Sequence, residues 1–341
     1  MNVEAALAPA VGTRLSAAVV RIERGGRVAF ERAYGTLATG DATPVYVDTR
    51  FDLASISKVF VATVALALVA RGVLALDAPL TGLVPEWRDS PRAAITLRML
   101  LAHTGGFRSG ADFRTLLARD VERFALVEEP LVAGPGERVV YSDLGFIALG
   151  VVLARAGGRG LQALVEAELA AFGVPATRFA PAGAERRAIP ATERDAWRGL
   201  VQGTVHDEKA ALLNGVAGHA GLFGSAADVA ALGEWYLAAL AGRATPLAPA
   251  LAREAVSLQA DDPVLRRGLG WALKTNDDNS CGALMSRATF GHTGFTGTSI
   301  WIDPARDLSV VLLTNAVHFG RGDFRDVRIA VCDAAVHEFG T

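Results

Sequence analysis

The sequence of 341 residues is poor in cysteine: only Cys281 and Cys332 are present, far apart and outside any C-x-x-C spacing. A disulfide framework or a cysteine-rich zinc site needs more cysteines at closer spacing, so the sequence predicts a reduced protein without disulfides. Long apolar runs are also lacking. The longest, residues 59–70, lies between Lys58 and Arg71 and is too short to cross a bilayer as a helix.

An excess of charge of one sign is absent as well. The 34 basic and 36 acidic side chains give a net charge of −2, and no basic run is available for nucleic acid. The first four residues lack the basic and long apolar regions of a signal peptide. We therefore expect a cytoplasmic monomer that acts on a small-molecule substrate, with no nucleic-acid or membrane partner.

Two pairs of β-rich runs lie near the two ends of the chain. A turn containing glycine or proline separates the runs of each pair, which predicts a β-hairpin. A segment with helical periodicity, residues 323–339, follows the second pair. The predicted hairpins are formed by residues 17–23 with 27–33 and by residues 298–303 with 308–314.

The middle of the chain consists mostly of helical stretches and Gly/Pro loops, with residues 181–198 the most loop-like. We therefore expect an α+β fold in one domain spanning 1–341. Residues 1–57 and 260–341 would form an antiparallel sheet flanked by helices, and residues 58–259 an inserted, mostly helical region. The active site is expected at their junction, a favoured place for a pocket.

Ser55 and Lys58 form an S-x-x-K motif directly before the apolar residues 59–70, which predict a buried helix. Ser55 is expected at the N-cap or in the first turn, with its hydroxyl on the same face as the Lys58 amine. Burial lowers the pKa of a lysine, so Lys58 is a candidate to take the serine proton. Amides at the helix start are candidates to hold an oxyanion. The alternative is an N-cap serine beside a lysine that extends from a core helix.

Two further polar motifs follow at long separations. Tyr141 begins a Tyr-Ser-Asp motif that opens a second apolar helix, residues 144–154, and a tyrosine near a cation can relay a proton. His292 begins a His-Thr-Gly motif, followed by further glycines before the strand starting at Ile300; glycines there indicate close approach of a ligand or backbone. Taken singly, each motif also fits a core tyrosine or a histidine in a polar turn.

The order and separation of the three motifs resemble the serine β-lactamase and penicillin-binding-protein superfamily. The tyrosine of the second motif and the His-Thr-Gly of the third are most similar to class C β-lactamases, D-alanyl-D-alanine peptidases and related esterases. Residues 96–107 look like the leucine-rich LLxHTSG signature, and residues 268–271 like the strand leading to the third motif. The resemblance covers nearly the whole chain. It implies a serine hydrolase that works through an acyl-enzyme and needs no cofactor.

The resemblance also implies roles for individual residues. Ser55 would attack the substrate carbonyl, and Lys58 would act as the base or stabilise a Tyr141 phenolate. Tyr141 would pass the proton to the leaving group and later help to activate water. The backbone amides of Ser55 and Phe295 would form the oxyanion hole, which is typically worth two to three orders of magnitude in rate per donor.

Two residues depart from the pattern of the superfamily. His292 stands where many relatives have lysine, so it would orient a substrate carboxylate only when protonated. With Thr293 and Gly294 it is expected to line the substrate site. Asp143 replaces a common asparagine, and its carboxylate would keep Lys58 protonated and repel an anionic substrate group. Both departures argue against efficient β-lactam hydrolysis.

Residues 203–223, together with residues 314–318, narrow the expected substrate. They look like a branch of the superfamily in which some members resemble amidases that cut the N-acetylmuramoyl-L-alanine bond. His206 and Asp207 would then line the substrate cleft. Lys209 stands where this branch is expected to have asparagine. The alternative is a polar loop in which these side chains hold each other and cap the next helix.

The leading substrate class is therefore an amide in a peptidoglycan-derived muropeptide. A small-ester carboxylesterase is the close alternative, followed by a weak β-lactamase or D-amino-acid peptidase. A metal site at His206, Asp207, Glu208 and His219 is a further alternative, but the H-E-x-x-H spacing is absent and the serine, lysine and tyrosine need no metal. A non-catalytic protein that binds cell-wall fragments would have lost one of those three residues, and all are present.

Overall fold

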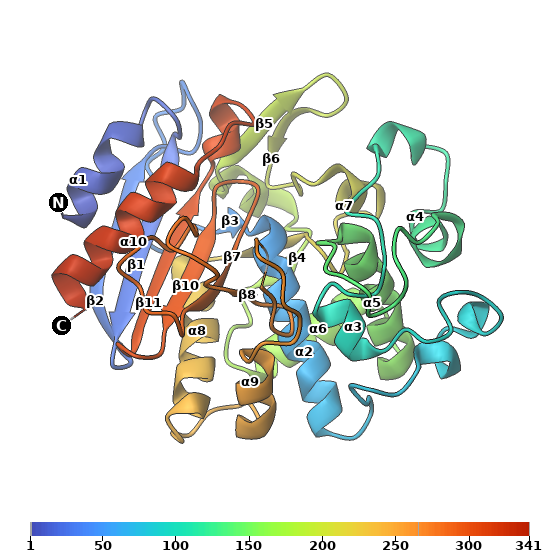
Figure 1. Cartoon of the computed structure of the whole chain (residues 1–341). Coiled ribbons are helices and arrows are strands. Elements are labelled where there is room, and N and C mark those ends of the chain that lie inside the picture. Colours follow the sequence, from blue (N-terminus) through green and yellow to red (C-terminus); the bar gives the residue numbers. More distant parts are fainter. Residues whose placement is uncertain (1, 265, 341) are drawn as a thin grey trace.

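The computed structural model describes residues 2–264 and 266–340, and its largest sheet has six antiparallel strands in the order β2-β1-β11-β10-β9-β8 (Figure 1). This order places the N-terminal hairpin beside the C-terminal one. The strands are β1 (Ala17–Arg24), β2 (Arg27–Gly35), β8 (Ala272–Leu273), β9 (Phe290–Thr293), β10 (Ser299–Asp303) and β11 (Leu308–Thr314).

Smaller sheets and helices make up the rest of the described chain. Strands β3 (Phe51–Asp52), β7 (Leu222–Gly224) and β4 (Arg178–Phe179) form one sheet, and β5 (Ala191–Asp195) and β6 (Gly199–Gln202) another. The helices are α1 (Val3–Leu7), α2 (Ser57–Ala70), α3 (Leu97–Leu101), α4 (Val121–Arg123), α5 (Asp143–Gly157), α6 (Leu161–Ala171), α7 (Glu208–Leu212), α8 (Ala226–Leu240), α9 (Pro249–Ala255) and α10 (Arg325–Phe339).

Both predicted hairpins of the large sheet are confirmed. β1 and β2 pair across Gly25 and Gly26, whose φ angles of 58° and 71° suit a tight turn that side chains rarely permit. β10 and β11 pair across the turn that contains Pro304. Because β1 also pairs with β11, the two ends of the chain are joined in one sheet, as the α+β prediction requires.

Alternate side chains of the central strands enter two different hydrophobic cores, because successive residues of a strand point to opposite faces. Val20 and Val310 lie in the core beneath α10, which covers one face of the sheet together with α1 (Figure 1). Val19 and Val311 belong to the other core, and α8 packs on that face. The sheet is therefore a middle layer between helices.

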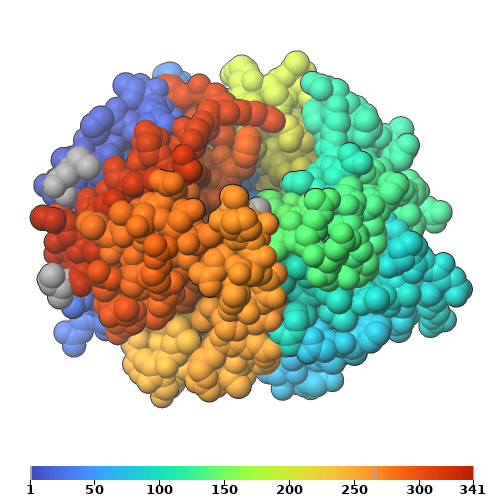
Figure 2. All heavy atoms as spheres, in the orientation of Figure 1, coloured from blue at the N-terminus to red at the C-terminus, as the bar shows by residue number. Residues whose placement is uncertain are grey.

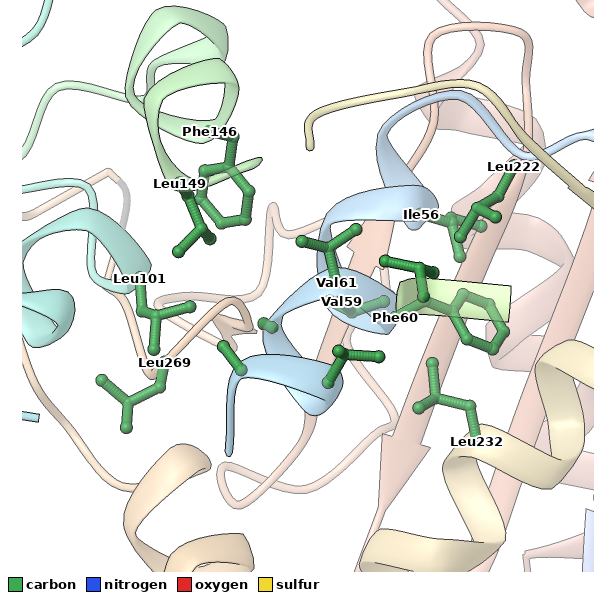
Figure 3. Close-up of a cluster of buried hydrophobic side chains, with 14 of the residues drawn as sticks. Ile56, Val59, Phe60, Val61, Leu101, Phe146, Leu149, Leu222, Leu232 and Leu269 are labelled. Carbon is green, nitrogen blue, oxygen red and sulfur yellow. The ribbon is translucent and has the colours of Figure 1, made fainter. Parts of the chain in front are cut away.

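Helix α2 is buried on nearly all sides, which fits a helix that is apolar around its whole circumference. Figure 3 shows Leu222 and Leu232 on one side of it and Leu101 and Phe146 on the other. Replacing the fully buried Phe60 with alanine would cost about 3–5 kcal/mol by the usual cavity relation. This burial fixes the start of the helix, where the S-x-x-K motif lies.

The middle of the chain has more regular structure than expected, and one of its helices packs on the large sheet. Residues 181–198 are not a loop throughout, since they contain the 3₁₀ helix Gly183–Ala188 and strand β5. The strand is held by distant groups, because Ala191 donates to the Leu37 carbonyl and accepts from the Asn315 amide. Helix α8 lies within the range expected for the inserted region yet covers the large sheet, so the boundaries at 57/58 and 259/260 stay predictions.

Within the described residues, no single helix combines the length and the apolar composition that a membrane crossing requires. Helices α5 and α6 meet that test only as a pair, bent by 77° between them.

Candidate active site

Two cavities share the lining residues Ser55, Tyr141 and Phe295. The larger has a volume of about 720 Å³ and the smaller about 290 Å³, and we call them the larger arm and the smaller arm of one cleft. Figure 2 shows a hollow between the orange and red C-terminal part of the chain and the green central part. These volumes are in the range of small-molecule sites.

The turn from β3 to α2 presents the candidate nucleophile. Ala54 has a φ of 47°, a left-handed conformation that costs a non-glycine residue about 1–2 kcal/mol, and its amide donates to the Asp52 carboxylate at 2.8 Å. Ser55 follows in a single 3₁₀ turn, Ala54–Ile56, that leads into α2. Ser55 therefore lies in the 3₁₀ turn just before α2 rather than in the first turn of α2 itself. The N-cap alternative is wrong, because Ile56 is the N-cap residue and the Ser55 hydroxyl accepts from Lys58 instead.

Lys58 is fully buried, and its ammonium has several polar partners. Nζ lies 3.0 Å from Ser55 Oγ, 3.1 Å from the His219 carbonyl and 2.8 Å from Asp143 Oδ1. The Tyr141 phenol is a fourth partner, so four acceptors share the three N–H donors of the ammonium. Burial lowers the pKa of Lys58, but Asp143 and Tyr141 outweigh it and the pKa is raised overall. The lowering of the Lys58 pKa expected from burial is therefore wrong, and the expectation that the Asp143 carboxylate keeps Lys58 protonated is confirmed.

Tyr141 lies in an extended segment that is fixed just before α5. Ser142 is the N-cap of α5 and accepts from the Gly145 amide, while its own amide donates to His103 Nδ1 at 3.1 Å. The His103 ring lies 4.7 Å from the Tyr141 ring between centroids. Burial holds the pKa of His103 well below its ordinary value, so the imidazole is neutral and Nδ1 can accept. No role for His103 was expected, although the leucine-rich signature contains it.

The third motif is joined directly to the nucleophile turn. The hydroxyls of Thr296 and Thr298 donate to the carbonyls of Asp52 and Leu53 at 3.0 and 3.2 Å. At Gly294, an added Cβ would lie 2.8 Å from the Leu53 carbonyl oxygen and 2.0 Å from the Thr298 hydroxyl, so only glycine fits.

This packing places Phe295, the next residue, beside Ser55 in both arms of the cleft. The expected substrate residues His292, Thr293 and Gly294 line the larger arm only. The other three expected substrate residues, Asp143, His206 and Asp207, line the smaller arm only.

His292 is a neutral imidazole in this structure. Burial and the nearby Arg267 and Lys58 cations lower its pKa to about 3. Nδ1 lies 2.8 Å from the Thr293 carbonyl, which can only accept, so Nδ1 carries the proton. At neutral pH His292 therefore offers hydrogen bonds and no positive charge to a substrate.

Two arginines supply the positive charge that His292 lacks, and sequence reasoning missed both. Arg267 and Arg328 are 5% and 9% exposed and both line the larger arm. Arg267 lies 5.1 Å above the Tyr141 ring, and Arg328 donates to the Gly294 carbonyl at 2.7 Å. Among the described residues, neither guanidinium takes part in an ion pair within 4.0 Å, and both Nε groups lack a hydrogen-bond partner. Arg267 precedes the residues 268–271 that were expected to lead to the third motif.

The smaller arm has a different character, because its charges are paired. Asp207 caps α7 by accepting from the Ala210 amide, and it also pairs with Lys209 at 3.0 Å and with His219 at 2.8 Å. The capping alternative for Asp207 and its place in the cleft are therefore both observed. His206 is buried, with its amide donating to Asp52 at 2.6 Å and its ring stacked on Phe295.

Asp143, Asp207 and His219 lie close enough together to be considered as a metal site. The same carboxylates already contact the ammonium groups of Lys58 and Lys209. A divalent cation would have to displace or repel both, so the donor set fits a lysine-neutralised pair of carboxylates better than a metal.

A buried S-x-x-K pair, a tyrosine and a glycine-requiring turn at the end of strand β9 together define a serine hydrolase with a β-lactamase-like fold. The Beta-lactamase family model matches residues 3–333, and the chain belongs to this family.

Similar proteins agree in family but differ in name. The chain is 33% identical to "Esterase EstB" from Burkholderia gladioli, over 90% of this chain and 88% of that protein. It is 31% identical to "N-acetylmuramyl-L-alanine amidase" from Bacillus subtilis, over 88% and 77%. A class C β-lactamase from Rhodobacter sphaeroides has the same fold, with a TM-score of 0.78 at 22% identity, covering 98% and 99%. The chain is thus a β-lactamase-family hydrolase of ester or amide bonds.

Proposed function

We propose that this hydrolase cleaves an amide bond in a peptidoglycan-derived muropeptide, through an acyl-enzyme on Ser55. The observation that carries the proposal is the pair of buried arginines, Arg267 and Arg328, in the larger arm beside Ser55. Burying a cation without a counter-ion is costly, and a site that accepts this cost is suited to an anionic ligand. Stem peptides carry carboxylates, whereas simple esters do not.

The charges of Lys58 and Tyr141 suggest how the acyl-enzyme forms. Because Asp143 keeps Lys58 protonated, the ammonium has no lone pair to accept a proton, and Tyr141, as a phenolate beside this cation, is the proposed acceptor of the Ser55 proton. The alkoxide attacks the amide carbonyl, and the amides of Ser55 and Phe295 hold the oxyanion. Tyr141 then passes the proton to the leaving nitrogen. In the second half, Tyr141 takes a proton from water, the resulting hydroxide attacks the acyl-enzyme, and Tyr141 returns the proton to the departing Ser55 Oγ.

We further propose that the reaction takes place in the cytoplasm, where recovered muropeptides would be available. The support is indirect: Cys281 and Cys332 are both buried free thiols, as expected of a protein that does not rely on disulfides. Burial raises the pKa of Cys281 to about 12, which makes this thiol unreactive.

Small-ester hydrolysis is the second candidate. It would use the same Ser55, Lys58 and Tyr141, and the 33% identity to a protein named as an esterase supports it. The two candidates differ in whether the substrate needs a negative charge.

The test compares a muramoyl-L-alanyl peptide with the same compound after amidation of its carboxylates, beside a p-nitrophenyl ester. We expect kcat/KM for the charged peptide to exceed that for the amidated one by about 10- to 100-fold, the size of a lost charge-assisted hydrogen bond. Arg267→Gln should remove the preference, whereas Arg243→Gln should preserve it, because Arg243 is paired with Glu234 and lines neither arm of the cleft. Equal rates for both peptides, with faster turnover of the ester, would favour the esterase instead.

A further inference from the structure

Lys209 lies between two carboxylates on the floor of the smaller arm. Its Nζ is 3.0 Å from Asp207 Oδ2 and 3.3 Å from Asp143 Oδ2. The other oxygens of these carboxylates face Lys58 Nζ and His219 Nε2, each at 2.8 Å. We call this continuous series of five side chains the ionic chain: Lys58, Asp143, Lys209, Asp207 and His219.

The ionic chain contacts the nucleophile through Lys58, and its two end residues, Lys58 and His219, also contact each other. Lys58 donates both to Ser55 Oγ and to the backbone carbonyl of His219. The side chains of Lys58 and His219 are almost completely buried, and the Lys209 side chain is 11% exposed. Solvent therefore screens these charges weakly, and each one depends on its neighbours.

Without the Lys209 ammonium, the Oδ2 atoms of Asp143 and Asp207 would lose the cation they share. Two nearby carboxylates that are poorly solvated do not both stay ionised easily, and one of them takes up a proton. Asp143 is the one in contact with Lys58. A protonated Asp143 would no longer hold the Lys58 ammonium by an ion pair, and the hydrogen bond from Lys58 to Ser55 would weaken.

We infer that Lys209 is a positioning residue, which keeps Asp143 ionised and thereby keeps the Lys58 ammonium on Ser55. This role is distinct from catalysis because Lys209 acts through Asp143 on Lys58. The inference rests on the acyl-enzyme mechanism proposed above, and it does not depend on which substrate is cleaved.

The charged groups around Asp143 determine the direction in which its pKa is shifted. Burial raises the pKa of Asp143, but the Lys58 and Lys209 ammonium groups and the nearby His219 ring outweigh burial and the Asp207 anion, so the pKa is lowered. Of the other charges on the smaller arm, Glu208 and Arg321 are paired with each other, and burial lowers the pKa of His206. Removing Lys209 should therefore raise the pH below which Asp143 is protonated.

The test measures the rate at which a fluorophosphonate labels Ser55 between pH 3 and 9, by mass spectrometry of the intact protein, because the lowered pKa of Asp143 places the wild-type acid limb at the low end of this range. Lys209→Met should move the acid limb of this profile upward by about one pH unit or more, which is the effect of one nearby charge. At the wild-type midpoint the variant should then react several-fold more slowly. Lys209→Arg should restore the wild-type profile, because it keeps the charge.

The third lysine of the chain provides a matched control. Lys274 is 1% exposed, donates to the Ala283 and Met285 carbonyls, and has no contact with the ionic chain. Lys274→Met should lower the unfolding temperature and leave the acid limb in place. If Lys209→Met fails to fold, Lys209→Gln keeps a donor without the charge and should show the same shift.

A Lys209→Met or Lys209→Gln profile that superimposes on the wild type would overturn the inference, as would a shift that Lys209→Arg does not restore. Failure of the proposed mechanism gives a different result. In that case the folded wild-type protein is not labelled at any pH, so its labelling rate has no acid limb to compare with that of the variants.

Discussion

Lys58 and Asp143 form an ion pair with 2.8 Å between Nζ and Oδ1, and the same ammonium donates to Ser55 Oγ. The first motif therefore carries a fixed cation rather than a neutral amine. Because Lys58 is a cation, its role in the proposed mechanism is to stabilise negative charge, and Tyr141 transfers the proton.

Tyr141→Phe is expected to reduce kcat by about 10²- to 10⁴-fold, because it removes a general acid and base but keeps the ring between His103 and Arg267. Steady-state kinetics on a p-nitrophenyl ester would measure the loss, and thermal unfolding would verify that the fold is retained. A variant with wild-type kcat would assign proton transfer to another group.

Gly294→Ala is expected to impair both activity and stability, since its Cβ would collide with the Leu53 carbonyl and the Thr298 hydroxyl. The shift needed to relieve such overlap typically costs about 1–3 kcal/mol, and it would move the proposed Phe295 amide away from Ser55. Gly160→Ala is the matched control, because Gly160 has open space around it and an ordinary φ of −57°. Urea unfolding and kcat of the two variants make the comparison, and equal behaviour would contradict the close approach.

His292 is expected to stay neutral through the whole working range, because its pKa lies at about 3. In NMR spectra of histidine-labelled protein, the signals that disappear in His292→Gln should not titrate between pH 5 and 8. Titration with a midpoint near 6.5 would mean that His292 can carry the positive charge for an anionic substrate after all.

Asp52 links stability to pH. Burial raises its pKa from 3.8 to about 6, despite hydrogen bonds from the His206 and Ala54 amides. The folded state thus binds a proton more tightly than the unfolded state, so this group contributes stability at low pH that is lost as the pH rises from about 4 to 6. The difference corresponds to about 3 kcal/mol.

The difference in unfolding free energy between the wild type and Asp52→Asn, from urea titrations at pH 4 to 7, should show this decline. Asparagine does not titrate, so it serves as the reference. A difference that is independent of pH would contradict the assignment to Asp52.

Local sequence patterns predicted helix α2, at whose start the S-x-x-K motif lies, and both hairpins of the large sheet. The apolar run after Lys58 gave a buried helix, and the β-rich runs around glycine- or proline-containing turns near both termini gave the hairpins, because these signals lie in contiguous residues. The spacing of Ser55 and Lys58 also predicted their contact, which a single helical turn enforces.

The remaining site residues depend on contacts that no short pattern contains. Arg328 lies on α10, more than thirty residues after the Gly294 carbonyl it binds, and Arg267 reaches the Tyr141 ring from over a hundred residues away. Lys209 was visible as a departure from an expected asparagine, but its bridging role requires Asp143 and Asp207 to meet in space. The S-x-x-K motif alone favoured a lowered pKa for Lys58, and the raised pKa followed only from the expectation that the Asp143 carboxylate would lie beside this lysine.

The most direct test of the account is intact-protein mass spectrometry after incubation with a fluorophosphonate, on the wild type and Ser55→Ala. The account predicts one adduct on the wild type and none on the variant, whose fold and unfolding temperature should be preserved because the change removes one hydroxyl at the partly exposed start of α2. An adduct that persists in Ser55→Ala, or no adduct on well-folded wild-type protein, would contradict Ser55 as the nucleophile and with it the roles given to Lys58 and Tyr141.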